Sequence, residues 1–208
     1  MILIGQYDSP FVRRVGIAMT LYGMTYEHRP WSTFGNADKV RQYNPLVRVP
    51  TLVLDDGDTL IESSAIIDWL DNRVGPVRAL FPASEPDRHR AIRIASLATG
   101  AADKAVALFY ELRLHTAVSD FWVARCRAQI TDTLSALERD LESRSTPFWF
   151  GDRIGHADIA AACALRFITE AHPGFVSPTT IPRLAAHAAR LEARPEFVAV
   201  SQPFIAPA

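Results

Sequence analysis

The segment from residue 44 to residue 64 constrains the fold of this chain more than any other part of its sequence. It begins with NPLVRVPTL, continues through Asp-Asp-Gly, and ends with an acid and two serines ahead of an amphipathic pattern. Asp-Gly between two short apolar runs is a strong signal for a tight hairpin turn. The segment therefore predicts strands over residues 51–54 and 59–61, followed by a helix that Ser63 or Ser64 caps.

The rest of the first third predicts strands that alternate with helices. A short apolar strand is expected over residues 2–4 and a second strand over residues 26–29. Between them, Ser9 is the expected N-cap of a helix and Pro10 its first residue, where a missing N–H costs nothing. A short helix is expected over residues 37–43, before an Asn-Pro pair ends it. The predicted order is therefore βαβ followed by ββα.

A connection rich in helix breakers separates this region from the remainder of the chain. It includes FPASEP over residues 81–86. After it, apolar residues recur at helical spacing, as in the stripe Ile94, Ala98, Ala101, Ala105, Leu108 and Leu112. The sequence therefore predicts an α/β domain over residues 1–83 and an all-helical domain over residues 84–208.

Composition and charge argue against several classes of function. A net charge of −1 over 208 residues gives no electrostatic basis for binding nucleic acid or an anionic membrane. Cys126 and Cys163 form neither a disulfide framework nor a metal-binding pattern. No apolar run approaches the length of a membrane span, and the first residues lack a signal-peptide core. We expect a soluble cytoplasmic protein with no metal site.

Several motifs together resemble the glutathione S-transferase superfamily. They are SPFVRRV over residues 9–15, the Val-Pro and Glu-Ser pairs within residues 44–64, and IPRL and RPEF between residues 181 and 197. The resemblance implies a thioredoxin-like N-terminal domain, a helical bundle as C-terminal domain, and a homodimer. It also implies that glutathione is the co-substrate, and that its thiol attacks a small, hydrophobic electrophile.

The resemblance implies that Ser9 activates the glutathione thiol. A hydroxyl at a helix N-terminus stands beside unpaired N–H groups and the positive end of the helix dipole. Such a place stabilises a thiolate relative to a thiol. Some classes of the superfamily use a tyrosine at the end of the first strand instead, so Tyr7 is the alternative. Its structural interpretation is an aromatic residue that packs beneath the helix.

The resemblance also implies where glutathione is held. Pro50 should follow a cis peptide bond, and the backbone of Val49 should pair with the cysteinyl part of the tripeptide. Arg48 is expected near the glycyl carboxylate, although a solvated surface arginine is the structural alternative. Glu62 and Ser63 are expected at the γ-glutamyl end, because a helix N-terminus binds a carboxylate and an adjacent acid pairs with the ammonium.

The acceptor substrate is expected along the helix that follows the domain boundary. Phe11, Ala102, Ala105 and Phe109 are the candidates for lining its site, while a helix-packing stripe explains the alanines equally well. Two other functions stay open: a glutathione-dependent isomerase or dehalogenase, and a binding or regulatory protein without catalysis.

A further segment, GDRIGHAD over residues 151–158, predicts the start of a helix. Gly155 occupies the cap position, and Asp158 is expected to accept hydrogen bonds from N-terminal amides. His156 is expected to be exposed in the first turn. We interpret the segment as a folding device.

Overall fold

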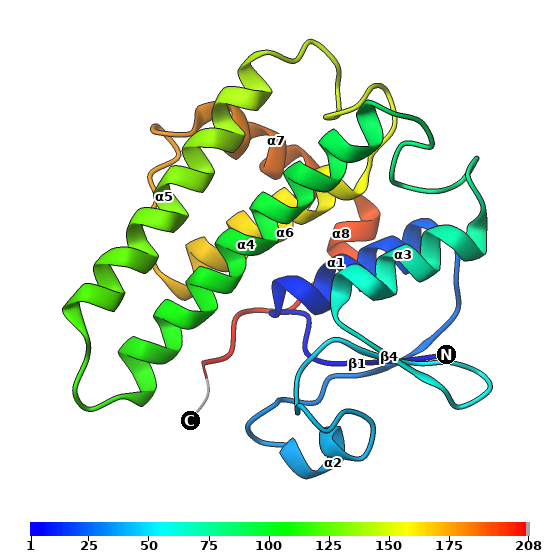
Figure 1. The fold of residues 1–208 in the computed structure, drawn as a ribbon, viewed down its shortest axis with the longest axis horizontal. Helices are drawn as coiled ribbons and strands as arrows, with labels where there is room; N and C mark the ends of the chain where they lie inside the picture. The colour runs from blue at the N-terminus through cyan, green and yellow to red at the C-terminus, as the bar shows by residue number, and fades with distance from the viewer. Residues whose placement is uncertain (207–208) are drawn as a thin grey trace. The chain divides into compact units, whose positions relative to one another are not determined.

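The computed structural model describes residues 1–206, which form two compact units. One comprises Met1–Ala83 together with the described residues from Arg194 onward, and the other comprises Ser84–Ala193. Figure 1 shows the helices and strands of each unit. None of the helices within residues 1–206 has both the length and the apolar character that crossing a bilayer demands.

The first unit contains a mixed sheet with the strand order β2-β1-β3-β4. Its strands are β1 (Ile2–Ile4), β2 (Glu27–Arg29), β3 (Thr51–Val53) and β4 (Thr59–Ile61). Its helices are α1 (Pro10–Leu21), α2 (Ala37–Arg41), α3 (Ser63–Val74) and α8 (Pro195–Ala199). Strand β1 runs parallel to β2 and antiparallel to β3, and β3 is antiparallel to β4. The predicted βαβ-ββα order is confirmed.

Helices α1 and α3 pack on one another and bury the apolar positions that face the sheet. The fully buried side chains of this core include Leu3, Ile17, Leu52, Ile66 and Leu70. The strands were recognisable in the sequence as short apolar runs, and the helices from apolar residues at helical spacing.

Gly5 allows the end of β1 to approach two other segments closely. It has a φ of +130°, and a Cβ placed there would lie 2.5 Å from Cγ2 of Val12 and 2.8 Å from Cβ of Val49. Both distances are shorter than atoms tolerate, so only glycine fits. The start of α1 and the loop before β3 therefore lie against the same point of the chain.

The predicted cap of α3 is wrong. Ser63 is the first residue of the helix, and Glu62 occupies the N-cap position with φ 66° and ψ 122°. Because Glu62 makes the sharp turn out of β4, Ser63 already lies inside the first helical turn. Its hydroxyl accepts a hydrogen bond from Arg14 instead of capping the helix.

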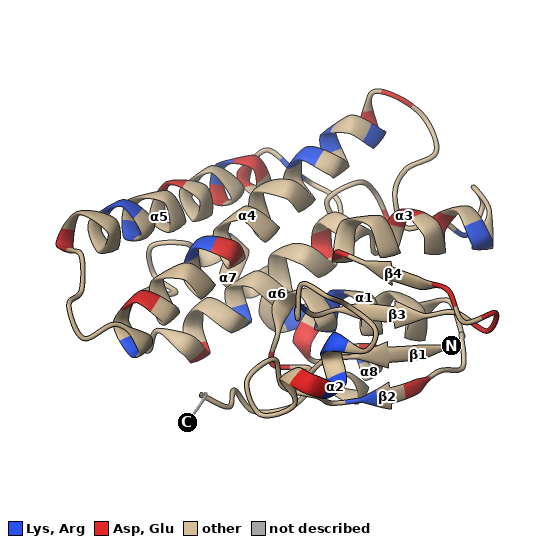
Figure 2. Ribbon diagram, turned by 60° about the horizontal axis from the view of Figure 1, so that its bottom comes forward, with Lys and Arg blue, Asp and Glu red and all other residues tan. Residues whose placement is uncertain are grey.

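The second unit is helical. Its helices are α4 (Asp87–Leu114), α5 (Asp120–Glu142), α6 (His156–Ala171) and α7 (Pro182–Glu192). Helix α4 packs against α5 and α6, and α7 packs against both of these. Figure 2 shows charged residues distributed along α5. The side of α5 turned inward carries Cys126, Ile130, Leu134, Leu137 and Leu141, all buried.

The start of α6 is held by one buried carboxylate. The Gly155 amide donates to Asp158 Oδ2 at 2.9 Å, and the Trp149 amide donates to Oδ1 at 3.0 Å. His187 Nε2 lies 2.9 Å from the same Oδ1. This confirms the expected role of Asp158. The expectation for His156 is wrong, since that side chain is buried, with 1% exposed, at the helix start.

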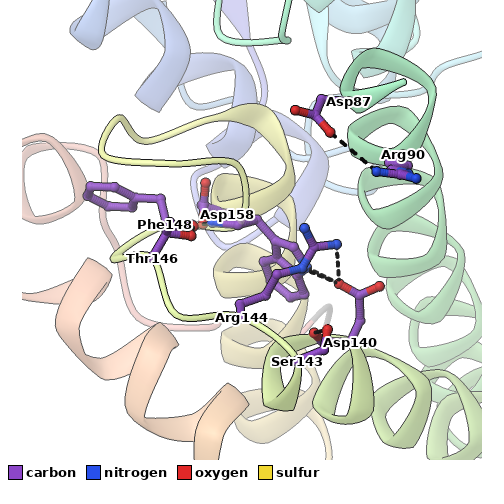
Figure 3. A network of polar contacts seen from close by, with 9 residues as sticks. Asp87, Arg90, Asp140, Ser143, Arg144, Thr146, Phe148 and Asp158 are labelled. Carbon is purple, nitrogen blue, oxygen red and sulfur yellow. Dashed lines mark hydrogen bonds and ion pairs between the residues drawn. The ribbon is translucent and has the colours of Figure 1, made fainter. Parts of the chain in front are cut away.

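A second carboxylate supports the neighbouring loop. Asp140 Oδ1 accepts a hydrogen bond from Trp149 Nε1 at 2.7 Å and is paired with Arg144 at 2.9 Å. Figure 3 shows the Arg144 guanidinium pointing at Asp140 on α5. Trp149 itself is fully buried.

The last described segment contacts the first unit. Arg13 of α1, with 2% exposed, donates from Nε to the carbonyl of Val200 at 2.8 Å and from Nη2 to that of Phe197 at 3.1 Å. The Tyr7 amide donates to Gln202 Oε1 at 2.9 Å. The expected helical domain over residues 84–208 included this segment. It joins the first unit because buried guanidinium groups require acceptors, and these carbonyls supply them.

Candidate functional site

Three loops of the first unit leave the sheet at one edge. The register pairs Ile4 with Thr51 and Thr51 with Ile61. Because β1 and β4 both run antiparallel to β3, the ends of β1 and β4 lie beside the start of β3. The residues expected from the sequence to hold or activate a ligand follow β1, precede β3 and follow β4. The topology therefore gathers them at the same edge.

Ser9 is the N-cap of α1, as expected. Its backbone is extended, with φ −68° and ψ 122°, and its Oγ accepts a long hydrogen bond from the Val12 amide at 3.4 Å. Pro10 follows as the first helical residue. A hydroxyl that accepts from the helix keeps its own hydrogen for another acceptor. The side chain is half-buried, so a ligand could provide that acceptor.

The Tyr7 side chain contacts other residues of the first unit. Its OH lies 2.9 Å from that of Tyr26, and its ring stacks on His28 with centroids 3.7 Å apart. A Cβ at Gly16 of α1 would lie 3.1 Å from Tyr7 Cε1. Burial, reinforced by the Tyr26 hydrogen bond, raises the pKa of Tyr7 well above its ordinary value. These are the contacts of an aromatic residue that packs beneath α1.

Sequence reasoning missed His28 as part of this arrangement. Its Nε2 lies 2.8 Å from the carbonyl oxygen of Gly5, and burial lowers the pKa of its imidazole. A neutral ring that donates this hydrogen bond secures the end of β1 where the loop to Ser9 begins. The available signal was the position of His28 in the middle of β2. Side chains alternate between the two faces of a sheet, so His28 lies on the opposite face from Glu27 and Arg29.

The loop before β3 contains the cis peptide bond that the resemblance implied, between Val49 and Pro50. Pro50 is buried and Val49 is half-buried, with its side chain against Gly5.

Asn44 organises this loop, and sequence reasoning missed it too. The side chain is 1% exposed. Its Nδ2 donates to the carbonyl of Arg48 at 2.9 Å and to Thr51 Oγ1 at 3.2 Å, while its Oδ1 accepts from the Leu46 amide at 3.0 Å. In the sequence, Asn-Pro was interpreted only as a helix end. A buried amide that satisfies several loop groups at once explains why this residue type stands there.

Two of the expected binding residues are paired with each other. Arg48 Nη1 lies 3.2 Å from Glu62 Oε1, and both side chains are about half exposed, at 57% and 49%. An exposed pair of this kind contributes little to stability, so a charged ligand can compete for either partner. Glu62 holds a backbone conformation that is rare outside glycine. Such strain is found most often at binding sites.

Ser63 is the buried polar residue of the expected set. Its side chain is 6% exposed and lies in the first turn of α3, where backbone N–H groups have no partner within the helix. Arg14 of α1 donates to its Oγ from Nη1 at 3.3 Å. Hydroxyl, amides and helix dipole thus converge at one point, which is the arrangement that binds carboxylates.

The residues expected to line an acceptor site differ in exposure. Phe11 and Phe109 are half-buried. Ala102 and Ala105 are buried, at 1% and 0% exposed, in the small-residue stripe of α4. The Ala105 carbonyl lies 2.9 Å from His172 Nε2 in the same unit. Burial of this kind is expected if the two alanines serve helix packing.

Comparison with known proteins identifies the family. The model for the N-terminal domain of glutathione S-transferase matches residues 3–78, and the model for the C-terminal domain matches residues 120–190. The chain belongs to the glutathione S-transferase family. Both halves are therefore those of the family, and the predicted thioredoxin-like domain and helical domain are confirmed.

The chain is also similar to individual proteins. The chain is 31% identical over 170 residues to the uncharacterised GST-like protein YibF of Escherichia coli (strain K12), covering 81% of this chain and 82% of that protein. It is 36% identical over 102 residues to maleylacetoacetate isomerase of Pseudomonas aeruginosa, about half of each. A glutathione S-transferase of Methylobacterium radiotolerans, crystallised with glutathione sulfonate, superposes with a TM-score of 0.88 at 31% identity, covering 100% of this chain and 98% of that one.

Proposed function

We propose that this protein is a glutathione transferase that ionises the thiol of bound glutathione at the N-terminus of α1 and directs it at a small hydrophobic electrophile. The observation that carries this proposal is the strand register, because it gathers Ser9, Val49 and Ser63 at one edge of the sheet. The glutathione derivative in the related Methylobacterium structure supports glutathione as the ligand.

Ser9 is the group proposed to stabilise the thiolate. A cysteine thiol has a pKa near ~8.5, and lowering it by one unit requires about 1.4 kcal/mol of preference for the anion. One charge-assisted hydrogen bond together with the helix dipole supplies roughly 1.5–3 kcal/mol. This is sufficient to leave the bound thiol largely ionised near neutral pH. The hydrogen of Ser9 Oγ fits this role because the oxygen already accepts from the Val12 amide.

The remaining groups are proposed to hold the two ends of the tripeptide. Ser63 and the first amides of α3 bind the γ-glutamyl carboxylate, and Glu62 pairs with the neighbouring ammonium. The backbone of Val49 pairs with the cysteinyl residue. Arg48 binds the glycyl carboxylate and exchanges its present partner, Glu62, for the ligand.

Substitution of Ser9 tests the proposal. Ser9→Ala should reduce kcat/KM for conjugation of a chlorodinitrobenzene-type acceptor on the order of a hundredfold, as loss of one anion-stabilising donor does elsewhere. The apparent pKa of the bound thiol, followed by thiolate absorbance, should rise, while Kd for glutathione changes little.

Tyr7→Phe is the matched control, since it also removes one hydroxyl beside α1. It should leave the thiol pKa near that of the wild type. Loss of activity in Tyr7→Phe with full activity in Ser9→Ala would transfer the catalytic role to Tyr7.

A glutathione-dependent isomerase is the second candidate function. The 36% identity to maleylacetoacetate isomerase favours it, over about half of the chain. Product analysis separates the two functions, because an isomerase returns glutathione unchanged whereas a transferase leaves a stable conjugate. We also propose a homodimer, which light scattering on the purified protein would detect from the mass in solution.

A further inference from the structure

The buried arginine Arg14 lies beneath the start of α3. It is on α1, has 4% of its side chain exposed, and donates from Nη1 to Ser63 Oγ at 3.3 Å. The two residues are 49 positions apart in the chain, so only the packing of α1 on α3 brings them together.

The direction of this hydrogen bond decides what the Ser63 hydroxyl can do. A serine hydroxyl has one hydrogen and two lone pairs. A guanidinium only donates, so it occupies a lone pair and leaves the hydrogen of Ser63 for another partner. Among residues 1–206, no acceptor takes that hydrogen. A buried hydroxyl that donates to nothing is ready for an acceptor from a ligand.

The charge of Arg14 strengthens the same preference. A cation bound to the oxygen polarises the hydroxyl and makes it a better donor, as in other chains of hydrogen bonds in a low-dielectric environment. The amides of the first turn of α3 add positive potential at the same point. All three features favour an anion that accepts from Ser63 Oγ.

We propose that Arg14 is a positioning residue for the γ-glutamyl carboxylate of glutathione. It orients and polarises the Ser63 hydroxyl so that this group donates to the carboxylate, without touching the ligand itself. The inference rests on the proposed function, because it takes that carboxylate as the occupant of the α3 start. It assigns to Arg14 a part in selecting the ligand that is separate from thiol activation at Ser9.

The test compares two ligands that differ only in that carboxylate: glutathione and γ-aminobutyryl-cysteinylglycine. NMR titration of wild-type protein should show glutathione to bind about tenfold more tightly, which corresponds to about 1.4 kcal/mol. In Arg14→Met this preference should fall to about twofold or less, and it should be intermediate in Arg14→Lys, which keeps the charge on a different donor.

Arg13→Met is the matched control. It removes an arginine of the same helix with 2% exposed, whose hydrogen bonds go to carbonyls of the C-terminal segment and not to Ser63. It should lower the melting temperature and keep the tenfold preference. A general loss of packing would lower the affinity for both ligands alike in both variants.

An Arg14→Met protein that is folded by circular dichroism and keeps the full preference for glutathione would overturn the inference. Arg14→Lys gives the same decision if Arg14→Met does not fold. A wild-type protein that binds neither ligand, or both equally, would overturn the proposed function first and the role of Arg14 with it. The two failures are distinguished because the second is seen before any substitution.

Discussion

Three polar side chains that were not predicted from the sequence as site residues connect the segments of the proposed site. Asn44 connects the loop before β3 to that strand, His28 connects β2 to the segment that follows β1, and Arg14 connects α1 to α3. Asn44 and Arg14 are buried and His28 is half-buried, so a partner left without its hydrogen bond would lower the stability of the protein.

Asn44 provides a prediction at this scale. Asn44→Ala leaves the Leu46 amide without its partner, and the Arg48 carbonyl keeps only the hydrogen bond from the Thr51 hydroxyl. We expect the free energy of unfolding to fall by about 1–3 kcal/mol, as for other buried groups that lose a hydrogen-bonding partner. Kd for glutathione should rise as well, because the same loop carries Val49. Denaturant melts and calorimetric titration measure the two effects.

Asn72→Ala is the control for this prediction. Asn72 is exposed on α3 and donates to Asp68 within its own helix. Its removal should change the unfolding free energy by less than about 0.5 kcal/mol. If Asn44→Ala keeps the wild-type affinity for glutathione, the loop does not depend on this amide.

Residues of this kind also mark the limit of what the sequence could predict for the site. Ser9 and Ser63 were recognisable because helix starts and short motifs are local. The contact between Arg14 and Ser63 spans 49 positions, and no periodicity encodes it. Asn44 acts locally, yet its burial depends on the sheet beside it.

At the scale of elements, prediction succeeded where capping residues mark the start of a helix. Ser9-Pro10 marks the start of α1, and Gly155 with Asp158 marks that of α6. Prediction failed at α3. Glu62, with a φ of 66°, is the N-cap of this helix, one residue earlier than expected, and the serines that follow it do not reveal this. Strand order was also out of reach, since the pairing of β1 with β3 depends on contacts between distant segments.

The start of α5 depends on a carboxylate from α4. Glu111 accepts a hydrogen bond from the Ser119 amide at 2.7 Å and lies 2.9 Å from His115 Nδ1. The Ser119 bond first, and then His115, hold the pKa of Glu111 below its ordinary value. A carboxyl group whose pKa is lowered by folding stabilises the protein at pH values above the pKa that the group has in the unfolded chain. That stability is lost as the pH falls through the folded pKa.

Glu111→Gln should therefore make the acid limb of the stability curve shallower. Between about pH 5 and pH 3, the free energy of unfolding of the wild type should fall more steeply than that of the variant. Asp132→Asn, which removes an exposed carboxylate from α5, should leave the slope close to wild type. Urea melts at several pH values measure these slopes. Equal slopes for wild type and Glu111→Gln would exclude Glu111 as a source of the acid sensitivity.

For the whole molecule, the notable feature is that the last described segment completes the first unit. Helix α8 packs on α1, and the carbonyls of Val200 and Phe197 satisfy Arg13. Figure 1 shows α8, coloured orange to red, beside the blue α1. The sequence led us to expect this segment in the helical domain, whereas its contacts place it in the first unit. Sequence patterns identify helices without telling which unit a helix joins.

Removal of residues 195–208 tests this arrangement. The truncated protein should show faster hydrogen exchange in α1, because Arg13 becomes a buried cation without these acceptors. Protection in α4 and α6 should change much less.

Asp158→Asn gives the opposite pattern and serves as the control. It weakens the network at the start of α6, so faster exchange should appear in α6 and not in α1. Exchange that rises equally in both units after truncation would contradict the assignment of α8 to the first unit.

The bond between Arg13 and Val200 joins residues 187 positions apart. During translation the chain emerges from its amino end, so the guanidinium of α1 is made long before the carbonyls that receive it. The whole helical unit must leave the ribosome in between. The unit synthesised first is consequently the one finished last, and a nascent chain that stalls after α7 carries an incomplete glutathione-binding half.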